Sequence, residues 1–156
     1  MNVELVDQTG RVAASDQAWI RERGVAALGL LGATGQVRAS VVDDRRRAEA
    51  HERYSRVPGT TDVLTFDLRD EPRGPLDTDV LLCLDEADRR ASERGHPARE
   101  ELLLYLVHAM LHCLGFDDHA ADDAARMHAE EDRVLSALGV GAVYSRPVAP
   151  GEGARA

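Results

Sequence analysis

Lysine is missing from this sequence of 156 residues, and cysteine and aromatic residues are scarce. All 19 basic residues are arginine, which we attribute mainly to the nucleotide composition of the source. The two cysteines, Cys83 and Cys113, form no C-x-x-C motif and no disulfide pattern, which suits a reducing compartment. Two Phe, three Tyr and one Trp offer no ladder of rings on which the bases of a nucleic acid could stack.

Long hydrophobic segments are also missing. The longest apolar run, residues 102–116, is interrupted by two histidines and is shorter than the ~20 residues that a membrane span needs. No N-terminal stretch joins a basic start to an apolar segment, so we expect no signal peptide, no membrane partner and a cytoplasmic location. The net charge of -9 argues against non-specific coating of nucleic acid, and we expect no DNA partner.

The pattern of apolar residues predicts an α+β fold with a small mixed β-sheet and helices packed on it. Strands are predicted at residues 3–7, 36–42, 61–68 and 78–85. Helices are predicted at residues 15–31, 45–55, 85–94, 97–115 and 121–138. We expect one domain over residues 1–144 and a disordered tail over residues 145–156.

The most informative stretch is LLLYLVHAMLHCLGFDDHA, residues 102–120, on the most apolar of the predicted helices. His108 and His112 are four residues apart, so both imidazoles lie on one face of the helix and can bind one metal ion. A turn at Gly115 can return Asp117, Asp118 or His119 as a third ligand. Three protein ligands leave a coordination position open for water, which is typical of catalytic zinc sites. The alternative is a pair of hydrogen-bonded core histidines.

The residue after the first histidine limits the chemistry. In the H-E-x-x-H motif of metalloproteases this residue is the glutamate that acts as general base. Here it is Ala109, so the sequence argues against a zincin-like protease. His96 and His128 are interpreted as surface or capping residues.

Two separate blocks resemble the YbeY family of endoribonucleases. HAMLHCLGFDD, residues 108–118, is similar to the family signature H-G-x-L-H-L-x-G-Y-D-H, and TDVLTFDL, residues 61–68, to its T-D-V-L-S-F strand. The resemblance extends over most of residues 37–138 and implies a zincin-like α+β fold. It implies a metal-dependent, single-strand-specific endoribonuclease that acts in small-subunit rRNA maturation and ribosome quality control. We expect one Zn²⁺ per chain, with another divalent metal such as Mn²⁺ as the alternative. Expected partners are single-stranded rRNA and small ribosomal subunit proteins.

The resemblance places the first two metal ligands on His108 and His112. The position of the family's third histidine is Asp118, and His119 lies one residue later. We favour Asp118, since a carboxylate is a competent zinc ligand and needs no change in the loop, and keep His119 as the alternative. A carboxylate cancels one charge of the ion, so we expect a more alkaline pH optimum than in relatives with three histidines, or a preference for a harder metal such as Mn²⁺.

The family also has an Asn-x-x-Tyr-Arg pattern whose arginine is proposed to act at the cleft. Here the segment reads HERYSR, residues 51–56, and the position of that arginine is Ser55. Arg56, one residue later, is the candidate catalytic arginine, although one residue along a helix turns a side chain by about 100°.

Arginines also form the basic cluster of this acidic chain. We name Arg45, Arg46 and Arg53 as candidate RNA-binding residues, and a solvated helix face explains them equally well. Because Ser55 replaces the family's arginine, a second hypothesis remains: a non-catalytic ribosome assembly factor in which the metal only stabilises the fold.

Overall fold

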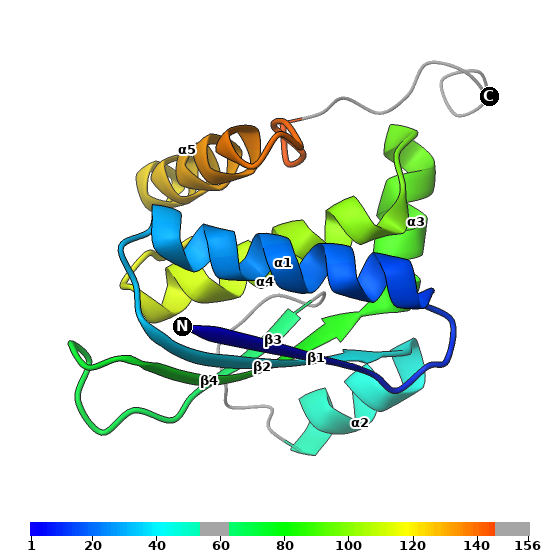
Figure 1. Cartoon of the computed structure of the whole chain (residues 1–156), viewed down its shortest axis with the longest axis horizontal. Coiled ribbons are helices and arrows are strands. Elements are labelled where there is room, and N and C mark those ends of the chain that lie inside the picture. The colour runs from blue at the N-terminus through cyan, green and yellow to red at the C-terminus, as the bar shows by residue number, and fades with distance from the viewer. Residues whose placement is uncertain (54–62, 146–156) are drawn as a thin grey trace.

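The computed structural model describes residues 1–53 and 63–145, which contain four strands and five helices. The strands are β1 (Asn2–Asp7), β2 (Gly35–Val42), β3 (Val63–Asp67) and β4 (Leu76–Cys83). The helices are α1 (Ala14–Leu30), α2 (Asp44–Arg53), α3 (Leu84–Arg94), α4 (Ala98–Cys113) and α5 (Ala121–Ala137) (Figure 1). Every predicted strand and helix is present in the predicted order. The predicted parts at residues 54–62 and 146–156 lie outside the described residues.

The strands form one mixed sheet in the order β1-β2-β4-β3. β1 pairs with β2 and β2 with β4 in parallel, whereas β3 pairs with β4 in antiparallel orientation. The predicted α+β class with a small mixed sheet is therefore confirmed. The edge strand β3 carries the TDVLTFDL block, of which residues 63–68 are described.

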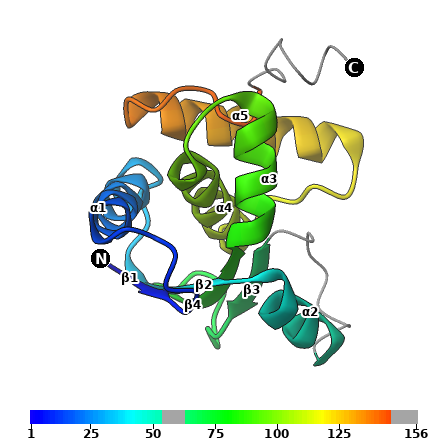
Figure 2. The same ribbon diagram turned by 90° about the vertical axis from the view of Figure 1, so that its right-hand side faces the viewer.

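One face of the sheet carries most of the helices. Figures 1 and 2 show α1, α3, α4 and α5 on one side of the sheet and α2 on the other. The strands have a matching pattern, since buried residues such as Val3, Val37 and Val80 alternate with more exposed neighbours. The core thus lies between the sheet and the helices above it.

Helix α4 is the centre of this core. Every residue from Glu101 to Leu111 is buried, and Leu103, Leu106 and Leu111 are completely inaccessible. Because a helix surrounded on all sides by protein has no polar face, α4 has no amphipathic pattern. The buried polar side chains of α4, Glu101 and His108, must therefore find their partners inside the protein. None of the helices in the described residues is long and apolar enough to span a membrane.

The two ends of α4 are fixed differently from each other. At the start, Pro97 is the N-cap and not, as predicted, the first helical residue. The interpretation of His96 as a surface or capping residue is wrong: its side chain is 4% exposed, and its Nε2 lies 2.7 Å from the buried Glu101 carboxylate. At the other end, Gly115 has φ 99°, as its predicted role after the helix requires.

The start of α2 positions the predicted basic cluster. Asp43 caps the helix by accepting a hydrogen bond from the Arg46 backbone N–H at 2.8 Å. Asp85 of α3 accepts a second hydrogen bond at this helix start, from the Asp44 backbone N–H at 2.7 Å. The Arg89 guanidinium lowers the pKa of Asp44 to about 2. These carboxylates already occupy backbone donors at the start of α2.

Gly35 provides a test of this fold. Its φ is 113°, and a Cβ there would lie 2.2 Å from the Leu76 carbonyl oxygen on β4. Gly35→Ala should lower the free energy of unfolding by more than about 2 kcal/mol, since both the backbone conformation and the contact forbid a side chain. Gly29→Ala, in an open position on α1, should raise it by up to about 1 kcal/mol. Urea unfolding measures both variants, and a Gly35→Ala protein as stable as the wild type would contradict the β2–β4 contact.

Candidate metal centre

His108, His112 and Asp118 lie close together at the end of α4. His108 Nε2 is 3.7 Å from Asp118 Oδ2, and His112 Nε2 is 3.8 Å from Asp118 Oδ1. The imidazole ring centroids are 5.0 Å apart and the rings are perpendicular. The potential ligand atoms of the three residues all lie within 4.8 Å of one another. The structure therefore brings these three predicted residues together.

The spacing of these atoms fits a shared metal ion better than direct hydrogen bonds. The separations of 3.7 and 3.8 Å exceed hydrogen-bond length. Two ligands placed about 2.0–2.1 Å from a tetrahedral zinc ion lie roughly 3.3 Å apart. In the described residues, the buried His112 Nε2 has no hydrogen-bond partner. A buried nitrogen left in this state is costly unless a ligand satisfies it, so the residues present fit a metal ion.

The protonation of His112 also suits a metal ligand. Burial lowers the pKa of His112 below its usual value, and the neighbouring His108 lowers it further, while Asp118 and Asp117 oppose the shift. A metal ligand must be a neutral imidazole with a free lone pair. Burial thus favours the form of His112 that can bind a metal.

The turn after α4 brings Asp118 to the histidines. The Gly115 N–H donates to the His112 carbonyl and the Phe116 N–H to the Leu111 carbonyl, which is a Schellman motif. Asp118 follows this reversal and is partly buried, with a side chain 23% exposed.

His119 points elsewhere. Its side chain is 65% exposed and lies 3.4 Å from Asp117, not beside His108. Asp117, Asp118 and His119 do form a second, more exposed group of possible ligands. The geometry agrees with the preference for Asp118 over His119, and the ligand set stays a prediction.

Sequence reasoning missed a buried acid behind the histidines. Glu131 of α5 is 1% exposed, and its carboxylate lies 2.5 Å from His108 Nδ1 and 2.8 Å from His128 Nδ1. His128, interpreted as a surface or capping residue, is 23% exposed; its Nδ1 contacts Glu131 and its ring stacks on Tyr144. A signal was present: Glu131 is four residues after Met127 and four before Leu135, on the core-facing stripe of α5.

Arg69 is a second residue that sequence reasoning passed over. Its guanidinium forms two hydrogen bonds to the Asp67 carboxylate and donates to the Cys113 carbonyl at the C-terminal end of α4. The side chain is only 7% exposed, and its guanidinium is engaged in these hydrogen bonds, so it is not available to a substrate. A cation at the negative end of the helix dipole stabilises the turn that carries His112.

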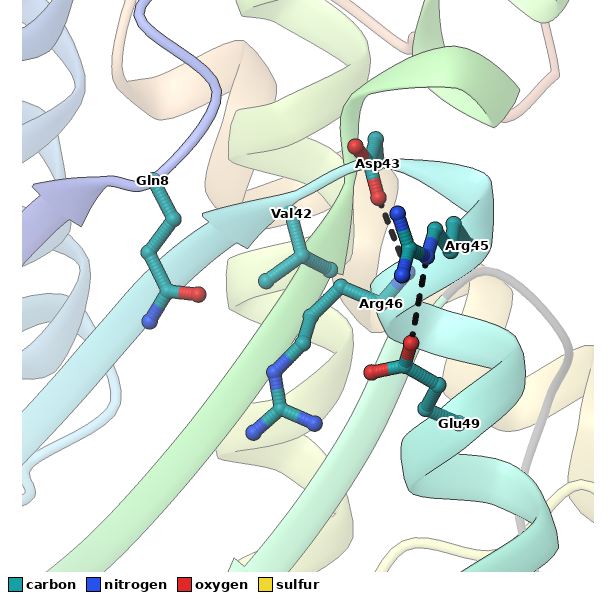
Figure 3. Close-up of a pocket in the computed structure, with 6 residues that line it drawn as sticks. All are labelled: Gln8, Val42, Asp43, Arg45, Arg46 and Glu49. Carbon is teal, nitrogen blue, oxygen red and sulfur yellow. Dashed lines mark hydrogen bonds and ion pairs between the residues drawn. The ribbon is translucent and has the colours of Figure 1, made fainter.

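The predicted RNA-binding arginines lie on α2. Figure 3 shows Arg45 and Arg46 beside a pocket of about 280 Å³ that Gln8, Val42, Asp43 and Glu49 complete. The Arg45 Nε donates to Glu49 at 3.3 Å, whereas the Arg46 guanidinium extends away from both acids (Figure 3). The Arg53 side chain and Arg56 lie outside the described residues, so their roles stay predictions.

Comparison with known proteins identifies the family of this chain. The family model described as Endoribonuclease YbeY matches residues 11–139, which include all the strands except β1 and every helix. The chain belongs to this family. The YbeY protein of Micrococcus luteus is 33% identical over 143 residues, covering 87% of this chain and 91% of that protein. That of Anaeromyxobacter sp. is 37% identical over 123 residues, covering 78% of this chain and 64% of that protein.

A solved structure supports the fold of this YbeY-family chain. The solution structure of a Thermotoga maritima protein matches with a TM-score of 0.58 and 17% identity. The match covers 96% of this chain and 99% of that protein. At this identity the likeness concerns the fold, and the chemistry rests on the residues described above.

Metal content tests the ligand set. Protein purified without chelators should contain one zinc ion per chain, and His108→Ala and Asp118→Ala should each lose it because each removes a ligand. His119→Ala, whose side chain is exposed, should keep it. Elemental analysis measures the four proteins. Loss of metal in His119→Ala and not in Asp118→Ala would reverse the assignment of the third ligand. A wild-type protein without metal would favour the alternative, in which His108 and His112 are hydrogen-bonded core histidines.

Proposed function

We propose that residues 1–144 form one zinc-dependent domain that cleaves single-stranded RNA internally in the cytoplasm, in the maturation and quality control of small-subunit rRNA. The observation that carries the proposal is the group of His108, His112 and Asp118 around the buried His112 Nε2, in a chain of the endoribonuclease YbeY family. The relatives named above are themselves described as endoribonucleases.

In this proposal His108, His112 and Asp118 hold the metal. A bound zinc ion would supply a Lewis acid for a phosphoryl oxygen and an activated water for attack on phosphorus. The chain's own part is to aim both imidazoles at one point, through the turn at Gly115, and to favour the neutral form of His112, whose pKa is lowered by burial. Three protein ligands leave a position for water or substrate, as in catalytic zinc sites.

Arginines would provide the positive charge for the RNA backbone. Arg46 is the better placed of the two described candidates, because its side chain is exposed and extends away from Asp43 and Glu49 (Figure 3). Arg45 shares its charge with Glu49, which weakens its attraction for a phosphate. Arg53 and Arg56 complete the proposal, Arg56 as the group that stabilises charge in the transition state. Small ribosomal subunit proteins are the proposed protein partners.

Two other possible functions have weaker support. A zincin-like protease needs a general base after the first histidine, and Ala109 is fully buried and carries none. Glu131 does not replace it, since both its oxygens face histidines inside the protein. A non-catalytic assembly factor requires only that the metal stabilises the fold, and the activity assay below separates it from a nuclease.

Cleavage of RNA tests the proposed activity. The wild type should cut a single-stranded RNA oligonucleotide at internal positions, cut a duplex of the same sequence much more slowly, and leave casein intact. Chelation should abolish the cleavage and added zinc should restore it, because the metal supplies the chemistry. His112→Ala should be inactive, and Glu130→Gln, whose residue pairs with Arg133 on α5, should match the wild type. Gel analysis of the products measures all of these.

The outcome that would favour an assembly factor is equally specific. In that case chelation lowers the melting temperature of the protein, since a metal that binds only the folded state stabilises it. RNA stays intact in every sample, and the chelated protein still associates with small ribosomal subunits.

The carboxylate ligand makes a prediction about pH. Asp118→His removes a negative charge next to the proposed metal, and a unit charge about 4 Å away is worth on the order of a few kcal/mol at a partly buried site. The metal-bound water should become more acidic, so the pH optimum of RNA cleavage should fall by at least about one unit. The activity supported by Mn²⁺ relative to that supported by Zn²⁺ should fall as well. Rate against pH with each metal is the measurement, and an unchanged profile would count against Asp118 as a ligand.

A further inference from the structure

Glu131 is a buried carboxylate that two histidines contact from different directions. Its Oε2 lies 2.5 Å from Nδ1 of His108 on α4, and its Oε1 lies 2.8 Å from Nδ1 of His128 on its own helix α5. The side chain is 1% exposed. Burial of a carboxylate among apolar residues costs several kcal/mol unless hydrogen bonds satisfy it. These two contacts, one to each oxygen, meet that requirement.

The chemistry of the carboxylate decides where the proton of each imidazole lies. An ionised carboxylate only accepts hydrogen bonds, so both Nδ1 atoms must donate. A neutral imidazole with its proton on Nδ1 has its lone pair on Nε2. In His108 this Nε2 is the atom that faces Asp118, at 3.7 Å. Glu131 therefore selects the form of His108 that can bind a metal at Nε2.

The contact of Glu131 with His128 fixes the orientation of the carboxylate toward His108. His128 stacks on the Tyr144 ring with centroids 3.5 Å apart and planes inclined by 7°, so the imidazole is held from its other side. The helix turns next to Glu131 carry Met127, Val134 and Leu135, all completely buried. The carboxylate cannot rotate away from His108 without losing His128 or opening this packing.

We propose that Glu131 is a positioning residue of the metal centre, which holds His108 in the tautomer and orientation that metal binding needs, while His128 and Tyr144 hold Glu131. The effect of Glu131 on metal binding rests on the proposed function, in which His108 is a metal ligand. The inference itself is based on the contact between Glu131 on α5 and His108 on α4, which the structure shows directly. The competing explanation is a buried acid that only stabilises the packing of the two helices.

Removal of the acceptor tests the proposal. Glu131→Met keeps the length and apolar packing of the side chain but accepts no hydrogen bond from His108. We expect zinc affinity, measured by competition with a chromogenic chelator, to fall roughly 10- to 100-fold, as for other groups that orient a metal-binding histidine. Glu131→Gln keeps one acceptor oxygen and should recover part of this loss. Glu130→Gln, whose residue pairs with Arg133, is the matched control and should bind zinc as the wild type does.

The tautomer of His108 is a readout that a purely structural role would not move. ¹⁵N NMR of the metal-free wild type, at a pH high enough to leave the His108 ring neutral, should show its proton on Nδ1. In Glu131→Met the same ring should show a mixture of Nδ1 and Nε2 forms. A wild-type His108 with its proton on Nε2 would overturn the proposal even if no Glu131 variant folds. Unchanged zinc affinity in a folded Glu131→Met protein would overturn it as well.

These outcomes also separate this inference from the proposed function. If the wild type binds no zinc, the proposed function fails, and the NMR result still decides whether Glu131 sets the tautomer. If the wild type binds zinc and cuts RNA but His108 carries its proton on Nε2 when metal is absent, the function stands and the role of Glu131 does not.

Discussion

Imidazoles inside an otherwise apolar helix are the constraint on which this structure depends. α4 is enclosed by the sheet and by its neighbouring helices, so bulk water does not reach the His108 ring or the Nε2 atom of His112. Carboxylates from two other segments lie beside these imidazoles instead: Glu131 on α5 and Asp118 after the turn at Gly115. Because an unsatisfied buried polar group costs on the order of 1–3 kcal/mol, the positions of α5 and of this turn are tied to the histidines.

The same burial gives the site its chemical character. It lowers the pKa of His112 and so keeps a ligand lone pair available near neutral pH. It also places Ala109 in the core, where the general base of a metalloprotease would otherwise stand. A metal ion bound as proposed would lie beside one carboxylate of the ligand set, Asp118, and near a second behind His108, Glu131. These charges would make a metal-bound water less acidic than three neutral ligands would.

The remaining helices and strands hold this arrangement from outside. Arg69, from the connection that follows β3, donates to the last turn of α4, where His112 lies. On the opposite side of the sheet, α2 carries Arg45 and Arg46, and its first backbone donors are already paired with Asp43 and Asp85. Phosphate contacts at α2 would therefore come from arginine side chains and not from the helix N-terminus.

The order and type of the elements could be predicted from the amino-acid sequence, because the periods of apolar residues and turn residues such as Gly115 are local signals. The His108–His112 pair could be predicted as well, since helical spacing alone places both rings on one face. The packing between elements was needed to show that Asp118 lies with this pair while His119 points to solvent, and that His96 and His128 contact buried acids. These contacts join residues from different elements, and neither a helical period nor a motif contains the packing of α5 against α4.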